Sequence, residues 1–151
     1  NQQYMDKNPN AAPTDFMKLA EIYVNKAKKD PAKKVENIDK AIGVYAKLAE
    51  KYPTLKPFAK LQEGNTAFQN ELDDKAIAAY TEVINELEAK QCDEDELSYL
   101  KTSYQYMGFI YTYDKQDFDT AKPYWDKLLK LDPQNKLAND AYEKAGLKPG
   151  E

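Results

Sequence analysis

The feature of this sequence that most constrains its fold is a pattern that occurs three times: an alanine followed, four residues later, by a large aromatic residue. The three pairs are Ala41 with Tyr45, Ala76 with Tyr80, and Ala121 with Trp125. A spacing of four places both members of a pair on one face of a helix. The alanines are 35 and 45 residues apart, and a period in this range is typical of helical repeat proteins.

A second helix-like run, which carries a glycine or alanine of its own, precedes each pair. The third copy is the most complete and reads Tyr104, Met107, Gly108, Tyr111, Ala121, Trp125, Leu128 and Pro133. The second copy reads Gly64, Ala76, Tyr80 and Val83, and has Glu88 where the third has its proline. The first copy reads Phe16, Leu19, Ala20, Tyr23, Ala41, Tyr45, Leu48 and Pro53. Three copies in register predict a repeat architecture.

These positions resemble the pattern of the tetratricopeptide repeat family. The resemblance implies an all-α fold, a TPR-like right-handed superhelix of antiparallel helix pairs. It places repeats at about 14–53, 57–90 and 97–133, with a capping helix at about 135–146. Against the family pattern, the first repeat has a long loop and the third has one extra residue in its turn. Residues 1–13 resemble the tail of a preceding repeat or a linker, which predicts a longer array.

Gly108 lies inside an aromatic run, where it costs about 1 kcal/mol of helix propensity relative to alanine. In an antiparallel pair, a glycine lets the second helix approach closely, and large residues then fill the space beside it. We therefore predict that Gly108 is a contact point between paired helices, small beside the large residues Tyr104, Tyr111 and Trp125, and that most aromatic residues fill the space between helices.

Helix ends can also be predicted from acidic residues and prolines. Asp and Ser-type side chains cap helix starts, so Thr14–Asp15, Asp73–Asp74, and Asp117 or Asp119 are candidate caps. A helix that begins near Phe118 would carry Pro123 past its first turn, where proline kinks a helix. A start nearer Thr120 would remove this conflict.

The basic residues are all lysine, with no arginine and no histidine. The net charge is −4 and the sequence pI is about 5.1, so no basic stripe for nucleic acid is expected. The sequence has no apolar run of the roughly 20 residues that a membrane helix needs, which predicts no membrane insertion of this segment.

Catalytic and metal-binding patterns are absent from the sequence. Without histidine there is no Ser–His or Cys–His pair, and no phosphate-binding glycine loop occurs. The acidic stretch Cys92–Glu96 lacks the alternation and glycine of a calcium loop, so we predict an acidic helix start with Cys92 exposed. We expect no enzyme, no metal site and no cofactor.

The family resemblance implies that the first helices of successive repeats line a concave groove that binds an extended peptide or a partner helix. Carried over by position, the predicted groove residues are Met17, Lys18, Glu21 and Asn25, then Leu61, Gln62, Asn65 and Gln69, then Gln105, Tyr106, Phe109 and Tyr113. Tyr106 and Phe109 lie off the packing face of their helix, and we predict that they anchor the partner. The alternative is that both pack on a helix of a neighbouring repeat.

The predicted function is a non-enzymatic scaffold for a protein or peptide of unknown identity, with self-association possible. One alternative is a structural spacer or C-terminal cap of a larger repeat protein, without a ligand. A second is a helical-repeat RNA binder, which the acidic pI opposes. Lysine- and tyrosine-rich helices with long loops are similar to exported tetratricopeptide proteins of Gram-negative bacteria. This predicts a periplasmic or cell-envelope location if the full-length protein has a signal peptide, and a cytoplasmic one otherwise.

Overall fold

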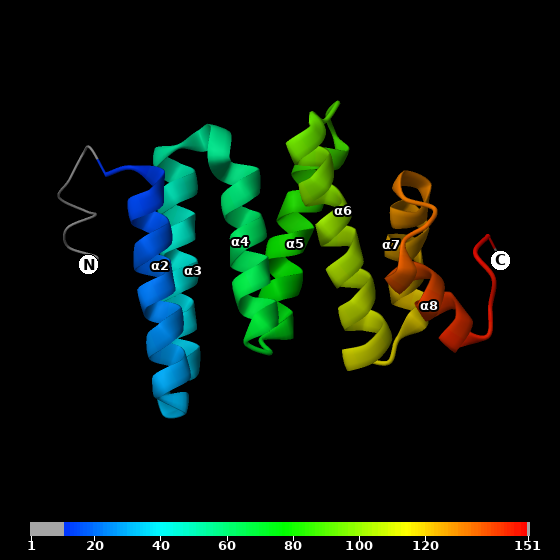
Figure 1. The fold of residues 1–151 in the computed structure, drawn as a ribbon, viewed down its shortest axis with the longest axis horizontal. Coiled ribbons are helices and arrows are strands. Elements are labelled where there is room, and N and C mark those ends of the chain that lie inside the picture. Colours follow the sequence, from blue (N-terminus) through cyan, green and yellow to red (C-terminus); the bar gives the residue numbers. More distant parts are fainter. Residues whose placement is uncertain (1–10, 151) are drawn as a thin grey trace. The chain divides into compact units, whose positions relative to one another are not determined.

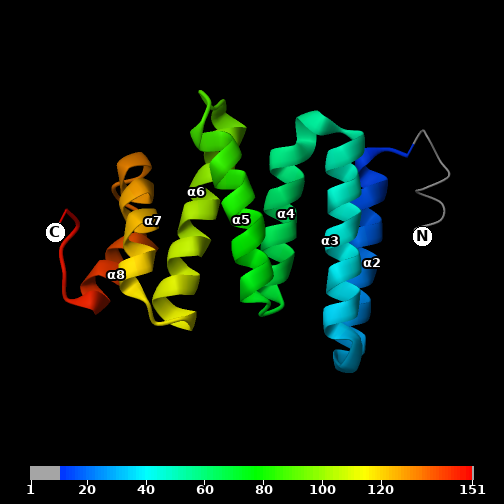
Figure 2. The ribbon, with the colours of Figure 1, turned by 180° about the vertical axis from the view of Figure 1, so that it is seen from behind.

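The computed structural model describes residues 11–150, and all of its regular elements are helical (Figures 1 and 2). The α-helices are α2 (Pro13–Lys29), α3 (Lys34–Lys51), α4 (Lys56–Gln69), α5 (Asp73–Glu88), α6 (Glu94–Phe109), α7 (Phe118–Leu131) and α8 (Lys136–Ala145). Short turns η1 (Pro31–Lys33) and η2 (Pro53–Leu55) are 3₁₀-helical, and η3 (Ile110–Asp114) is π-helical. The seven described α-helices pack in sequential pairs, which confirms the predicted all-α class.

The chain divides into two compact units, and the division falls within α5. We call residues 1–79 the N-terminal unit and residues 80–151 the C-terminal unit, and describe each by itself. The predicted tail at residues 1–13 lies almost entirely outside the described residues. The handedness of the predicted superhelix stays a prediction.

In the N-terminal unit, α3 packs between α2 and α4. The core of this unit consists of buried residues from all three helices: Phe16, Leu19, Ala20, Ala41, Val44, Tyr45, Leu48 and Ala59. The N-cap of α2 is Ala12, two residues before Thr14, because Pro13 takes the first helical position, where its missing N–H is not needed. Asp15 therefore lies inside the first turn, and its carboxylate accepts a hydrogen bond from the Ala12 N–H at 2.9 Å. The predicted cap at Thr14–Asp15 was wrong by this shift.

In the C-terminal unit, α6 packs against α7, and α8 packs against both. Gly108 supports the Trp125 ring: a Cβ at this position would lie 2.6 Å from two ring carbons. Trp125 is fully buried, and its indole N–H donates to Thr112 Oγ1 at 2.8 Å. The predicted close contact at Gly108 is thus confirmed.

The turn η3 accommodates the extra residue of the third copy. Its π-helical character is seen in the Lys115 N–H, which donates to the carbonyl of Ile110, five residues back, at 2.9 Å. Thr112, the partner of Trp125, lies within this turn and is buried. The insertion therefore places a hydroxyl beside the indole.

Polar side chains cap the helices of the C-terminal unit. Asp93 Oδ1 accepts from the Glu96 N–H at 2.8 Å, and Glu96 Oε1 accepts from the Asp93 N–H at 3.1 Å. This reciprocal capping box confirms that the acidic stretch starts a helix. Asp117 caps α7 through the Thr120 N–H at 3.1 Å. Helix α7 thus begins at Phe118 and carries Pro123 in its interior, as the earlier of the two predicted starts requires.

Candidate functional site: the outward surfaces of the first helices

Helix α2 presents its predicted groove residues to solvent. Met17, Lys18, Glu21 and Asn25 are all exposed. Met17 is 37% exposed and Ile22, next to Glu21, is 48% exposed. The predicted face of α2 therefore carries two large apolar side chains among polar ones.

Helix α4 divides its predicted residues between interior and surface. Leu61 is only 6% exposed, so its side chain packs in the interior and cannot serve a partner. Gln62 and Asn65 are half-buried and Gln69 is exposed. Leu61 and Gln62 are adjacent in the sequence and therefore lie on different sides of the helix. The prediction from repeat position placed both in the groove.

The predicted residues at the end of α6 and in η3 are all half-buried and already have neighbours. The Tyr106 ring stacks on Tyr80, with centroids 5.8 Å apart and planes at 27°. Burial, and then the nearby Tyr106, raises the pKa of the Tyr80 phenol. The Phe109 and Tyr113 ring centroids lie 4.8 Å apart. Tyr106 is therefore partly committed to packing within the C-terminal unit.

Helix α8 lies along this side of α6. The Asn135 amide donates to Gln105 Oε1 at 3.0 Å. One helix length further on, Lys144 Nζ lies 4.7 Å from the Tyr113 ring centroid, a cation–π distance. Asn135, which caps the start of α8, contacts Gln105 in the last turns of α6, and Lys144 near the end of α8 contacts Tyr113 in η3, which continues α6. The two helices therefore run in roughly the same direction (Figure 1).

A hollow of about 380 Å³ lies between α6, the end of α7 and the start of α8, and we call it the α6–α8 hollow. It is lined by Glu94, Leu97, Ser98, Lys101, Thr102, Gln105, Leu128, Asp132 and Asn135. Of the predicted groove residues, only Gln105 lines it. Lys101, Gln105 and Phe109 are spaced by four, so extending the predicted face back by one turn would have found Lys101.

The lining of the α6–α8 hollow is rich in polar groups without partners. Lys101 is half-buried, yet no carboxylate of residues 11–150 pairs with it. The side chains of Glu94 and Asp132 likewise make no hydrogen bond or ion pair with the described part of the chain. Glu94 is exposed, and Lys101 and Asp132 are half-buried, so all three charges are accessible to a ligand of complementary charge. The hollow can therefore bind a ligand with both charged and amide groups.

At the end of α5, Glu88 stands where the family pattern has proline and forms a network instead. The Tyr104 hydroxyl donates to Glu88 Oε1 at 2.5 Å, and Lys127 Nζ donates to the same oxygen at 2.9 Å. Burial opposes ionisation of Glu88, but the hydrogen bonds from Tyr104 and Lys127 prevail and lower its pKa. Burial and Glu88 together raise the pKa of the Tyr104 hydroxyl. This network ties α5, α6 and α7 together.

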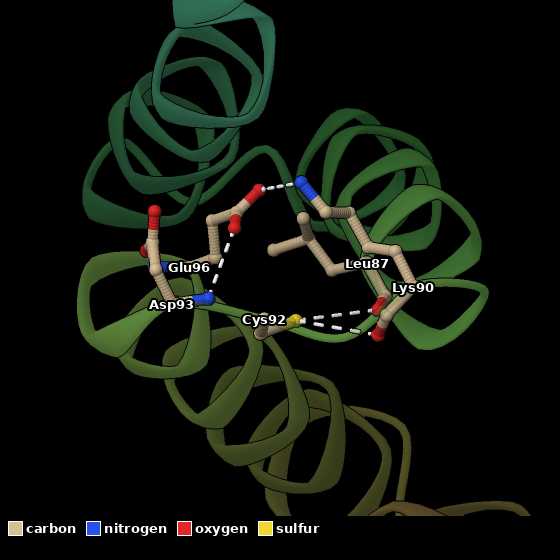
Figure 3. A network of polar contacts seen from close by, with 5 residues as sticks. All are labelled: Leu87, Lys90, Cys92, Asp93 and Glu96. Carbon is tan, nitrogen blue, oxygen red and sulfur yellow. Dashed lines mark hydrogen bonds and ion pairs between the residues drawn. The ribbon is translucent and has the colours of Figure 1, made fainter.

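The α5–α6 turn is also fixed by local contacts (Figure 3). Lys90 Nζ lies 2.5 Å from Glu96 Oε2, and the Cys92 thiol donates to the Leu87 carbonyl at 3.3 Å. Cys92 is half-buried rather than exposed as predicted. Burial, and then the nearby Glu96, raises the pKa of its thiol. The prediction failed because it used only the charge of neighbouring residues, whereas the thiol turns toward the carbonyl of Leu87 at the end of α5.

Metal clusters and membrane-spanning helices would indicate other classes of function. Within residues 11–150, no three side chains of Cys, Asp or Glu come together to hold a metal ion. No helix in this part of the chain combines the length and the apolar character that a membrane crossing requires.

Residues 16–54 match the family model described as "Tetratricopeptide repeat". The match begins in the first turn of α2, includes η1 and α3, and ends in η2, so this helix pair is similar to a tetratricopeptide repeat. Repeats of this family generally serve as protein-binding scaffolds and are usually non-catalytic. Searches of curated proteins and of solved structures found no match to the chain.

Proposed function

We propose that this chain is a non-enzymatic scaffold that binds an extended segment of a partner protein on the outward surfaces of its first helices. In the C-terminal unit, the proposed binding surface is the α6–α8 hollow. In the N-terminal unit, taken by itself, it is the exposed face of α2 at Met17, Lys18, Glu21 and Asn25. Gln62, Asn65 and Gln69 of α4 belong to the same proposed surface.

The observation that carries this proposal is that three charged residues in the lining of the α6–α8 hollow, Glu94, Lys101 and Asp132, form no ion pair with another residue of 11–150. Lys101, Glu94 and Asp132 supply charges of both signs, while Ser98 and Thr102 supply hydroxyls that donate and accept. An extended peptide presents backbone donors and acceptors at regular intervals, and these groups can satisfy that lining. Phe109 and Tyr113 continue the same side of α6 and offer apolar area for a side chain of the partner.

The test blocks the hollow without disturbing the core. Thr102→Arg places a long side chain in the hollow from a half-buried position. Asn85→Arg is the control, because it introduces the same side chain at an exposed position of α5. A partner is first isolated with full-length protein, and its affinity for each variant is then measured. We expect Thr102→Arg to weaken binding about tenfold or more, the scale of a lost hot spot, and Asn85→Arg to leave it unchanged. Normal binding by Thr102→Arg would overturn the assignment of the hollow.

Tyr106 and Phe109, the two predicted anchors, are now distinguishable. Since Tyr106 stacks on Tyr80, Tyr106→Ala should lower the melting temperature as well as any affinity. Phe109→Ala should weaken partner binding with a smaller change in melting. The reverse order would place the partner on Tyr106.

The alternative is that these repeats act as a spacer or cap and bind nothing. Under this alternative, Thr102→Arg and Phe109→Ala leave every function of the full-length protein intact, whereas deletion of the repeats does not. The exported location suggested by the resemblance is a separate proposal, and fractionation of cells expressing the full-length protein tests it.

A further inference from the structure

A second hollow, of about 340 Å³, lies in the C-terminal unit where the end of α5, the start of α6 and the end of α7 meet. Its floor is formed by four leucines, namely Leu87, Leu97, Leu100 and Leu131. Leu131 is 37% exposed, so part of the floor is open to solvent. We call this the leucine–lysine hollow. Its volume is within the range of ligand pockets in proteins.

The rim of the leucine–lysine hollow is basic. Lys90, Lys127 and Lys130 line it, against a single carboxylate, that of Glu88. This differs from the α6–α8 hollow, where two carboxylates accompany one lysine. The two hollows of the same unit therefore present different chemistry to a ligand.

The charges on the rim are not equally available. Lys127 shares its charge with Glu88 at 2.9 Å, and Lys90 is paired with Glu96 at 2.5 Å (Figure 3). Lys130 has no carboxylate partner among residues 11–150. An ammonium group beside apolar surface attracts a ligand that combines a carboxylate with an apolar side chain.

The walls of this hollow are fixed before any ligand arrives. The Cys92–Leu87 and Lys90–Glu96 contacts hold the α5–α6 turn, and the Glu88 network ties the ends of α5 and α7 to Tyr104. A preformed hollow spares a ligand the entropy cost of ordering it.

We propose that the leucine–lysine hollow docks a segment of a partner protein in which a large aliphatic or aromatic side chain is flanked by Asp or Glu. The apolar side chain covers the leucine floor, and a carboxylate pairs with Lys130. This hollow shares only Leu97 with the α6–α8 hollow, and its proposed ligand does not depend on the function proposed for that surface.

The probe is a random-peptide display library, selected against the full chain. We expect the enriched peptides to share one apolar residue with acidic neighbours. A synthetic peptide from that set should bind Lys130→Glu at least about tenfold more weakly than the native protein, as for a lost hot spot. Lys28→Glu is the matched control, because Lys28 is an exposed lysine in the last turn of α2, as Lys130 is in α7. It should bind normally.

Cys92 lines the hollow and reports on its occupation. Saturating peptide should slow the reaction of Cys92 with N-ethylmaleimide, and Thr102→Arg should leave both binding and protection unchanged. A selection that enriches no peptides, or peptides without acidic residues, would overturn the proposal. So would normal binding by Lys130→Glu, or binding without protection of Cys92. The neutral variant Lys130→Gln, checked by circular dichroism, separates the loss of a charge from any loss of fold.

Discussion

The pairs α2–α3 and α6–α7 follow the same small-beside-large pattern but pack it differently. In α2–α3 the small residue of the first helix is Ala20 and the aromatic of the second is Tyr45, which keeps 8% of its surface exposed. In α6–α7 the corresponding residues are Gly108 and Trp125, and Trp125 is fully buried. The pair with glycine instead of alanine on its first helix therefore has the larger aromatic ring, tryptophan instead of tyrosine, on its second.

The two pairs also differ in how their first helices end. Helix α2 ends at Lys29 and continues through the 3₁₀ turn η1, whereas α6 continues directly into the π-helical η3. The π turn contributes Thr112 to the Trp125 indole, a contact that an extra residue in the helix makes possible. The extra residue in η3 is therefore compatible with the small-beside-large packing, because η3 is itself helical and its Thr112 accepts the hydrogen bond of the buried Trp125 N–H.

The largest expected effect is the loss of Trp125. Trp125→Ala removes a fully buried ring and its hydrogen bond, and should lower the free energy of unfolding by about 3–5 kcal/mol. Tyr45→Ala should cost less, because Tyr45 is smaller and not completely buried. Urea unfolding followed by circular dichroism measures both variants. Equal losses of stability would show that the two helix pairs depend equally on their aromatic residues, and would contradict the difference in packing described above.

Two of the helical glycines, Gly43 and Gly108, test the close approach directly. Gly108→Ala would place a methyl group 2.6 Å from the Trp125 ring, and overpacking of this kind costs about 1–3 kcal/mol. Gly43 lies in α3 with nothing within 4 Å of its missing Cβ. Gly43→Ala should therefore stabilise by up to about 1 kcal/mol from helix propensity alone. A lower melting temperature for Gly108→Ala together with a higher one for Gly43→Ala would support the close approach of Gly108 to Trp125. A higher melting temperature for both variants would exclude it.

The sequence was sufficient for the helix pairs and for Gly108 because both depend on local spacing and residue size. It was insufficient for the two hollows that we propose as binding surfaces. The α6–α8 hollow combines Lys101 of α6 with Asp132 after α7 and Asn135 before α8, and no spacing in the sequence shows that these segments meet. Leu61 was placed on the surface because position in a repeat does not reveal which neighbour covers a side chain. The π turn also has no signature beyond one extra residue.

Thr112 gives a third, intermediate effect. Thr112→Val keeps the shape of the side chain but removes the acceptor of the Trp125 N–H, and a buried donor left without a partner costs about 1–3 kcal/mol. Thr112→Ser retains the hydroxyl and should cost less than Thr112→Val. A double-mutant cycle with Trp125→Phe isolates the hydrogen bond. If the two single changes are additive, the indole N–H has no energetic link to the π turn.

The smallest expected effect concerns the ends of the second helices. Helix α3 is followed by Pro53, whereas α5 ends at Glu88, whose carboxylate binds Tyr104 and Lys127. The pKa of Glu88 is lowered from its ordinary value of 4.5, so the folded state binds this proton less tightly than the unfolded state. Its contribution to stability is therefore complete above about pH 4.5 and disappears as the pH falls through the lowered pKa.

Glu88→Gln should accordingly be less stable than the native protein at neutral pH, by at most about 1 kcal/mol because the pair is partly exposed. The difference should shrink as the pH falls below 4.5, since the native carboxyl group then becomes neutral as well. Glu50→Gln, on the exposed side of α3, is the control and should show little difference at any pH. Urea unfolding of the three proteins across this pH range measures the effect. A difference between Glu88→Gln and the native protein that does not change with pH would mean that the amide fails for reasons of geometry, and that the charge of Glu88 does not hold the end of α5.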